Sequence, residues 1–413
     1  MATIALQVGK PSWARTKYDA VIVGSLLVLG LYFPTSIGER FSTTLLGIDL
    51  LLALVIVSLL FLEGKHHPSL LVCVSLLTIV PLLLVFTYTS GLHTFTFGAL
   101  GGYAVLSVLL ITDLREIPFP RSLFYLYAAA NILNISVGVA ILAGSELVTQ
   151  FLVTHYSVFY PELVPNMLLL RKPILTFGTH SIAAFFLYLF FYASLQTYSL
   201  KGKKLFLMFA ICYLLLTAAL LSVSGLTLAF VGALQLLWCL WSSIRRKWFW
   251  AGAIFTVLGA VAGFQLLDAV VKNWADVAET AKLILFSSDN GFLGRVTPGG
   301  TMRYSLEYLQ YHPLSPVGVA DKSGIMFTDS GLIEYLLRGS VVLLALVYGG
   351  LFFFLRRSLL ARSDAYWLFL VILAFELGFS TLTNFRALYL LPFLVVYLNG
   401  LRRTDTGGPF PSS

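Results

Sequence analysis

The chain has 413 residues, of which 58% are hydrophobic and only 11% are charged. Soluble globular domains carry about 25% charged residues, so this composition excludes a soluble globular protein and indicates a membrane protein. Lysine and arginine outnumber aspartate and glutamate by 27 to 19, which gives a net charge of +8. In a membrane protein such an excess first signals orientation rather than nucleic-acid binding, and we expect no nucleic-acid partner.

Long stretches without any Asp, Glu, Lys or Arg define the expected membrane helices. A span needs about 20 apolar residues, so stretches 66–112 and 205–244 must each hold two helices, with turns at 87–93 and 222–225. The expected fold is an all-α polytopic membrane protein with about twelve transmembrane helices in a single integral domain, residues 1–413, or ten or eleven if a late segment is re-entrant. The expected spans lie at 20–38, 44–62, 66–112 (two), 122–144, 173–200, 205–244 (two), 248–267, 331–355, 365–383 and 386–400.

The distribution of basic residues predicts the orientation of these spans. With the amino terminus inside and sides alternating, 17 of the 27 basic residues fall on the inside, many in short runs such as 201–204 and 245–247. This bias predicts cytoplasmic termini. The first apolar segment lacks a cleavage site and is expected to remain as an anchor. The three cysteines fall inside predicted helices, so they indicate neither a disulfide framework nor a metal site.

Two expected outside loops are long enough to carry function. The first, 145–180, is apolar and aromatic before Arg171 and Lys172, and is suited to lie in the membrane interface. The second, 268–330, is the most polar region, with helices expected at 268–282 and 302–311. We interpret it as a cap over an outward-facing cavity.

Ten basic residues fall outside against the positive-inside rule, and six of them are arginines. The planar guanidinium group suits bidentate binding of phosphate. The candidate diphosphate-binding residues are Arg171, Arg295, Arg303, Arg338 and Arg386. The alternative is local pairing, of Arg303 with Glu307 and of Arg338 with Glu334, with lipid headgroups binding the remaining arginines.

The second loop resembles that of a known family. Three stretches carry the resemblance: Gly294-Arg295; Arg303 followed by His312-Pro313 and Gly318; and Asp329-Ser330-Gly331, which leads into a helix with Glu334 and Arg338-Gly339. They are similar to the outside loop of the bacterial O-antigen polymerase and ligase superfamily. An upstream segment from Arg171 to His180 resembles the step of this family into the following helix. The resemblance implies a fold of the GT-C type.

The activity that this resemblance implies is glycosyl transfer. A family member would polymerise undecaprenyl-diphosphate-linked oligosaccharide repeats at the periplasmic face of the bacterial inner membrane, with inversion and without a metal or other cofactor. Its partners would be lipid-linked donor and acceptor, the bilayer and a chain-length regulator. Ligases, which transfer polymer to lipid A-core, have His-Asn where this chain has Asp329-Ser330, and Thr-x-Ser-Arg where it has 221–225, so the polymerase is favoured.

Candidate catalytic residues follow from the need for a base at the acceptor hydroxyl. They are Asp329, Glu334 and His312. Asp329, with Ser330, is equally suited to cap the following helix, and both His312 and His180 are also compatible with structural roles. Tyr304 belongs to a set of outside aromatic residues suited to stack on sugars, although interfacial belts explain such residues equally well.

Two other classes remain open. A multi-pass transporter or flippase of lipid-linked sugars would share the twelve-helix layout, but intramembrane charge is sparse, chiefly Asp49 and Glu376, and no inverted repeat is evident. A metal-dependent lipid-sugar transferase would need paired acids in the first outside loop, which offers only Glu39 beside Arg40.

Overall fold

The computed structural model describes nine stretches of the chain, and within them every regular element is an α-helix. The described residues are 12–33, 43–63, 68–90, 97–157, 162–243, 301–312, 315–320, 330–382 and 384–405. The helices are α1 (Ser12–Tyr32), α2 (Thr43–Glu63), α3 (Leu70–Leu77), α4 (Ile79–Thr89), α5 (Phe97–Ile111), α6 (Arg121–Leu142), α7 (Glu146–Tyr156), α8 (Leu163–Leu169), α9 (His180–Lys201), α10 (Lys204–Ala219), α11 (Val223–Ser243), α14 (Thr301–Tyr311), α15 (Gly331–Ser358), α16 (Arg362–Glu376) and α17 (Phe385–Asp405).

The helices follow the charge-free stretches of the sequence. Eleven of the twelve expected spans contain a helix, with α3 and α4 forming one of them. Helix α4 ends at Thr89, within the expected turn 87–93, and α11 begins at Val223, within the expected turn 222–225. The remaining span, 248–267, and the expected helix 268–282 lie outside the described residues. The helix expected at 302–311 is present as α14.

Within the described residues, five helical segments are long and apolar enough to cross a membrane. They are Leu70–Thr89, Arg121–Leu142, His180–Lys201, Ser224–Trp241 and Gly331–Ser358, and four shorter apolar helices accompany them, at Val21–Tyr32, Gly47–Leu62, Gly98–Ile111 and Lys204–Ala219. The described part of the chain is therefore consistent with a helical membrane protein. Cys73, Cys212 and Cys239 lie in described helices and form no disulfide bond there.

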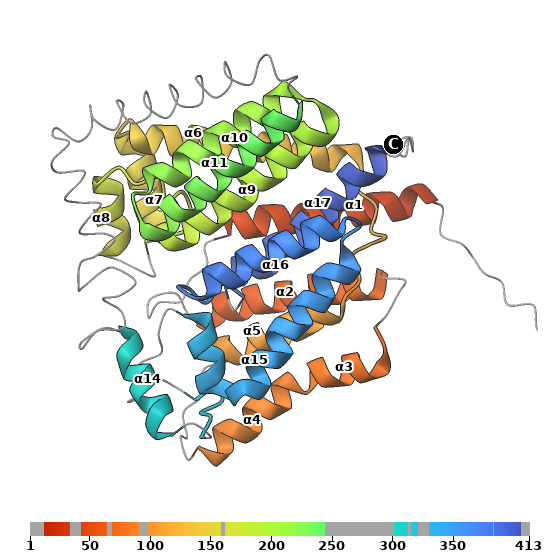
Figure 1. Cartoon of the computed structure of the whole chain (residues 1–413), viewed down its shortest axis with the longest axis vertical. Helices are drawn as coiled ribbons and strands as arrows, with labels where there is room; N and C mark the ends of the chain where they lie inside the picture. Colours follow the sequence, from red (N-terminus) through yellow and green to blue (C-terminus); the bar gives the residue numbers. More distant parts are fainter. Residues whose placement is uncertain are drawn as a thin grey trace, which may run out of the picture.

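The helices pack in two groups joined through α17 (Figure 1). In one group α9 packs against α10 and α11, and in the other α5 packs against α2, α3, α4 and α15. Helix α17 contacts α1, α9, α2 and α5, so it lies between the groups. Helix α9 is the most enclosed of the five segments, with 83% of its apolar window buried, which explains why it is apolar on all sides.

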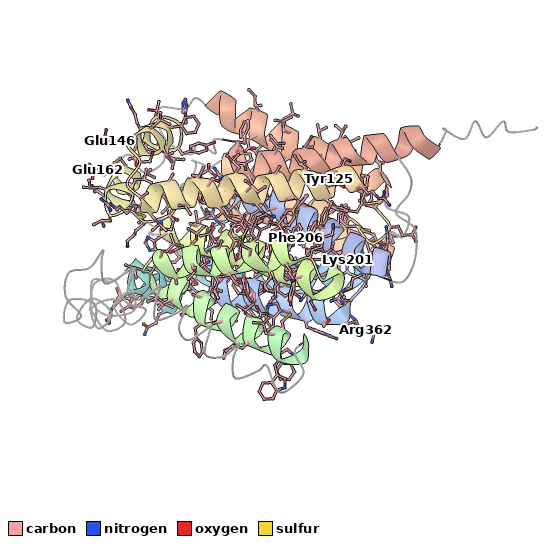
Figure 2. All side chains as sticks on the ribbon, turned by 90° about the horizontal axis from the view of Figure 1, so that it is seen from above. Tyr125, Glu146, Glu162, Lys201, Phe206 and Arg362 are labelled. Atoms are coloured by element: carbon pink, nitrogen blue, oxygen red, sulfur yellow. The ribbon has the colours of Figure 1, made fainter. Side chains whose placement is uncertain are left out.

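The ends of the bundle differ in the segments that they carry. Figure 1 shows α7, α8 and α14 at one end, opposite the carboxy terminus. In Figure 2, Glu146 and Glu162 lie at that end, whereas Lys201 and Arg362 lie toward the other. The two expected outside loops thus share one end of the bundle, which we call the loop end.

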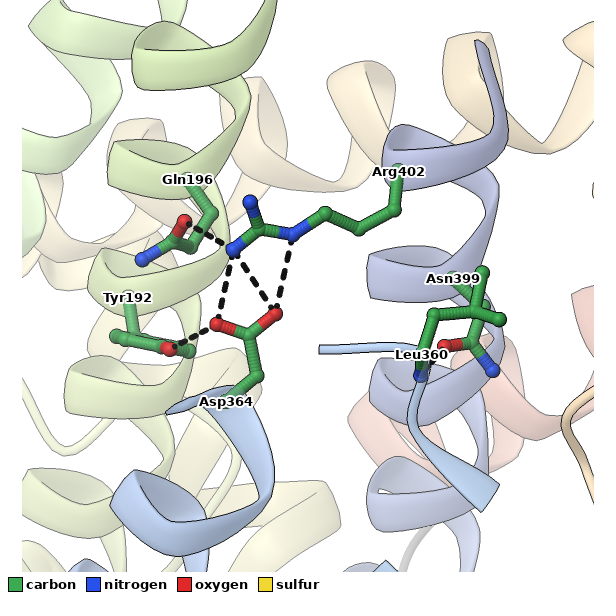
Figure 3. Close-up of polar contacts among 6 residues, drawn as sticks. All are labelled: Tyr192, Gln196, Leu360, Asp364, Asn399 and Arg402. Atoms are coloured by element: carbon green, nitrogen blue, oxygen red, sulfur yellow. Dashed lines mark hydrogen bonds and ion pairs between the residues drawn. The ribbon is translucent and has the colours of Figure 1, made fainter. Parts of the chain in front are cut away.

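A polar network ties three helices together near the opposite end (Figure 3). Asp364 of α16, only 2% exposed, forms an ion pair with Arg402 of α17 at 3.1 Å and accepts a hydrogen bond from the Tyr192 hydroxyl of α9 at 2.9 Å. Arg402 also donates to Gln196 of α9 at 3.4 Å. Because all these groups have partners within the fold, we assign the network a structural role.

Helix α15 is interrupted near its beginning. Gly339 (φ −147°, ψ 21°) and Ser340 (φ 59°, ψ −165°) are not helical and separate residues 331–338, the half-helix, from the rest of α15. The sequence did not predict this break, because one glycine inside an apolar stretch is compatible with a continuous helix.

Candidate functional site

The break in α15 frees backbone carbonyl groups, and a distant segment satisfies two of them. The amide of Val317 donates to the Leu337 carbonyl at 2.9 Å, and the amide of Gly318 donates to the Arg338 carbonyl at 2.8 Å. A broken helix inside a membrane protein is tolerated only where other groups satisfy its exposed backbone. Segment 315–320, which carries part of the family-like motif, therefore stabilises the end of the half-helix.

Segment 315–320 also packs tightly against α4. Gly318 has φ +62°, and a Cβ atom there would lie 2.2 Å from Thr87 Oγ1 and 2.3 Å from the Leu83 carbonyl oxygen. The Val319 amide donates to Thr87 Oγ1 at 2.8 Å. Both the backbone conformation and the close approach require glycine at this position.

Two of the predicted site residues meet on the half-helix. Arg338, itself 5% exposed, donates from Nε to Glu334 Oε1 at 2.8 Å and from Nη1 to the Gly318 carbonyl at 3.0 Å. The Glu334 side chain is 14% exposed. The pairing of Arg338 with Glu334 is one of the two local pairs considered from the sequence. Its burial means that removal of either partner leaves an uncompensated charge.

A fully buried carboxylate lies at the other end of the half-helix. Glu376 Oε1 accepts hydrogen bonds from the amides of Thr381 (2.6 Å) and Leu382 (2.7 Å), and the Tyr348 hydroxyl lies 3.5 Å from Oε2. The Tyr103 hydroxyl is buried nearby without a hydrogen-bond partner, and the Tyr103 ring lies edge to face with that of Tyr335 at 6.2 Å. Sequence reasoning noted Glu376 only as an intramembrane charge, although such a charge is itself a signal of function.

Ser330 was expected to share in capping the half-helix, but its side chain does not do so. The Ser330 side chain makes no capping hydrogen bond, and its hydroxyl donates to the Glu376 carbonyl at 3.3 Å instead. The predicted sharing of the cap by Ser330 is therefore wrong, because the end of α16 competes for this hydroxyl. Asp329, the other candidate cap and a candidate base, lies outside the described residues, as do Arg295 and the side chain of Tyr304.

Arg386 is completely buried, and the fold engages its guanidinium group. It donates to the carbonyls of Gly30 (3.3 Å), Leu31 (2.8 Å) and Phe33 (3.2 Å) and to Thr176 Oγ1 (3.1 Å). These carbonyls end α1, where a cation is favoured by the helix dipole. The rings of Phe177 and Tyr156 lie 5.3 Å and 5.9 Å from its Cζ atom. This environment identifies Arg386 as an anchor between α1, α17 and the loop that precedes α9.

That loop carries two further candidates. Arg171 is exposed, has φ 54°, and its guanidinium group lies beside Gly144 at the end of α6. Burial lowers the pKa of the neighbouring Lys172 ammonium below its ordinary value. His180 is half-buried at the first position of α9, where Thr179 caps the helix by accepting from the Ile182 amide at 3.3 Å. Non-glycine residues with positive φ often occur at functional sites.

The remaining candidates lie on α14. Arg303 forms an exposed ion pair with Glu307 at 2.6 Å, with side chains 45% and 43% exposed, so this contact is easily exchanged for a ligand. His312, at the end of α14, is exposed and its ring lies 4.9 Å from that of Tyr308. Helix α14 packs through Tyr308 and Leu309 against Ile333 and Leu337 of the half-helix. Arg303 and His312 therefore lie on or next to α14, which packs against the half-helix that carries Glu334 and Arg338. Arg171 and Arg386 lie on other elements.

Among the described residues, no group of three or more His, Cys, Asp or Glu is arranged to hold a metal ion. Comparison with family models, with curated proteins and with solved structures finds no match to this chain.

Proposed function

We propose that the protein is a glycosyltransferase that polymerises undecaprenyl-diphosphate-linked oligosaccharide repeats, as in O-antigen synthesis, at the periplasmic face of the bacterial inner membrane. The observation that carries the proposal is the hydrogen bonding between two segments that resemble the family, segment 315–320 and the half-helix. Gly318 and Arg338, 20 residues apart, bond reciprocally: the Gly318 amide to the Arg338 carbonyl at 2.8 Å, and Arg338 Nη1 to the Gly318 carbonyl at 3.0 Å. Among the described residues that carry the resemblance, Gly318 and Arg338 are thus joined directly.

The proposed reaction assigns different tasks to these residues. The acceptor hydroxyl attacks the anomeric carbon of the donor, the bond from that carbon to the diphosphate oxygen breaks, and the lipid diphosphate leaves with the bonding electrons. Glu334, which is buried but retains some solvent contact, takes the acceptor proton; Asp329 and His312 remain alternatives. Arg303, with its exchangeable partner, is suited to the diphosphate, where such stabilisation is worth about 3 kcal/mol.

The layout suits substrates that are anchored in lipid. We propose twelve spans in a fold of the GT-C type, both termini in the cytoplasm, and the loop end in the periplasm. Sugars of donor and acceptor would then lie just outside the bilayer, next to α14 and the half-helix, while their lipid tails stay among the helices. The proposed partners are the two lipid-linked substrates, the bilayer and a chain-length regulator.

The broken helix favours a second candidate, a carrier of lipid-linked sugars. Carriers bind their substrates at discontinuous helices and at intramembrane charges, and α15 is interrupted at Gly339 and Ser340 with the buried Glu376 nearby. A ligase would use the same donor chemistry with lipid A-core as acceptor.

One experiment separates these functions. Purified protein receives lipid-linked repeats in detergent with a chelator present, with and without lipid A-core. Longer lipid-linked products support the polymerase, and transfer only to lipid A-core supports the ligase. If the lipid-linked repeats stay unextended but move across the bilayer of vesicles that contain the protein, the protein is a carrier. Activity that the chelator abolishes indicates the metal-dependent class.

A further inference from the structure

Glu376 connects three segments that are distant in the sequence. Its Oε1 atom accepts from the amides of Thr381 (2.6 Å) and Leu382 (2.7 Å), in the turn that leads to α17. Its backbone carbonyl accepts from the Ser330 hydroxyl at 3.3 Å, just before the half-helix. The Tyr348 hydroxyl, in the long part of α15, lies 3.5 Å from Oε2. The residue is therefore placed to fix these segments relative to one another.

The Glu376 side chain occupies the space that a side chain at position 331 would need. A Cβ atom on Gly331 would lie only 1.6 Å from Glu376 Oε2, and 3.2 Å from the Cα atom of Ser380. Any side chain at position 331 would thus push the half-helix away from the carboxylate. Gly331 is the first residue of α15, so this contact defines where the half-helix begins.

Both ends of the half-helix have a close neighbour. The Glu376 carboxyl group lies beside its first residue, Gly331, and Arg338 lies at its carboxy-terminal end, where the helix dipole favours a positive charge. Arg338 is in turn bonded to the Gly318 carbonyl at 3.0 Å. The half-helix, which carries Glu334 in its first turn, is held at both ends.

We propose that Glu376 is a positioning residue for the glycosyl transfer: it fixes the half-helix, and through it sets the place of Glu334. This inference rests on the proposed function for its catalytic consequence. Glu376 itself contacts no substrate, because its side chain is completely buried.

The first test replaces one carboxyl oxygen with an amide group. Glu376→Gln retains an oxygen acceptor for the Thr381 and Leu382 amides, but its amide hydrogens need space where Oε2 lies against Gly331, so they push the half-helix away. A displacement near 1 Å lowers catalysis by about 100-fold, so we expect kcat to fall by that order while KM for the lipid-linked repeat changes less than about twofold. Glu146→Gln, an exposed carboxylate on α7, serves as the control and retains both parameters.

A size exchange tests the contact itself. Gly331→Ala should lower kcat in the same way, because the new methyl group collides with Oε2. Adding Glu376→Asp retracts the carboxylate by about 1.5 Å, the length of one carbon–carbon bond, and should restore part of kcat. A residue that only stabilises the fold would make the double variant worse than either single variant, and this result would overturn the proposal.

Hydrogen–deuterium exchange separates this inference from the proposed function. In purified protein without substrate, Glu376→Gln and Gly331→Ala should accelerate amide exchange in residues 331–338 and leave α9 unchanged. If wild-type protein elongates repeats but Glu376→Gln has wild-type kcat, the positioning role is wrong. If wild-type protein does not elongate repeats, the proposed function fails. Exchange still decides whether Glu376 holds the half-helix: faster exchange supports the contact, and unchanged exchange overturns it.

Discussion

At the scale of single residues, the buried arginines serve different purposes although sequence reasoning grouped them. Arg386 donates to three carbonyls at the end of α1 and to Thr176, whereas Arg338 pairs with Glu334. Both were recognised as outside cations, and the local pairing of Arg338 with Glu334 was considered from the sequence, but the partners of Arg386 are not its neighbours in sequence. The Arg386 partners at Gly30 and Leu31 lie 356 and 355 residues away. No local pattern contains such a contact.

Arg386→Ala should destabilise the protein strongly. Hydrogen bonds to a charged group each contribute about 1.5–3 kcal/mol, so loss of this set should lower the free energy of unfolding by about 3 kcal/mol or more. Thermal unfolding in detergent measures the effect, with Arg362→Ala, an exposed arginine of α16, as the matched control. Equal melting temperatures for the two variants would contradict the anchoring role.

Glu334→Gln tests the proposed base. Glutamine can still accept a hydrogen bond from Arg338 but cannot take a proton, so the elongation rate should fall by about 100-fold or more. Protein level and melting temperature report whether the fold survives. If the variant is folded and elongates repeats at the wild-type rate, Glu334 is not the base, and Asp329 or His312 takes that role.

At the scale of elements, the sequence allowed the helices to be placed but not their interruption. Charge-free stretches and turn residues located α4, α5, α10 and α11, and the spacing of α14 was confirmed. The break in α15 was not predicted, because Gly339 and Ser340 lie in a run that is apolar enough to continue as a helix. Glu376 was recognised as an intramembrane charge, but its contact with Ser330 was not predicted because the two residues are 46 positions apart.

Gly318→Ala should disrupt the packing of segment 315–320 on α4. The new Cβ atom would meet both Thr87 Oγ1 and the Leu83 carbonyl, at 2.2 Å and 2.3 Å. Gly202→Ala is a matched control, since it has a similar φ of +64° but no atom within 4 Å of the new Cβ. We expect Gly202→Ala to cost about 1 kcal/mol and Gly318→Ala to cost clearly more, measured by thermal unfolding.

A second substitution sharpens this comparison. Adding Thr87→Ala removes one of the three clashing atoms at Gly318 but leaves the Leu83 carbonyl oxygen and the Thr87 backbone nitrogen in place. The double variant should therefore remain destabilised. Full recovery, or equal stability of Gly318→Ala and Gly202→Ala, would show that the segment is free to move away from α4.

At the scale of the whole molecule, the proposed function requires both long loops to lie on one side of the membrane. Figure 1 shows α7, α8 and α14 at the loop end. In a cysteine-free background, Glu162→Cys should react with a membrane-impermeant maleimide added to spheroplasts, whereas Arg362→Cys should react only after lysis. Labelling of Arg362→Cys in intact spheroplasts would contradict the proposed orientation.

The most direct test of the proposed function is the chain length of lipid-linked product made by the purified protein from single lipid-linked repeats. We expect a ladder of products that differ by one repeat, and we expect Arg303→Ala to reduce the ladder strongly while the protein stays folded. Single repeats that remain unextended by wild-type protein would contradict the proposed function.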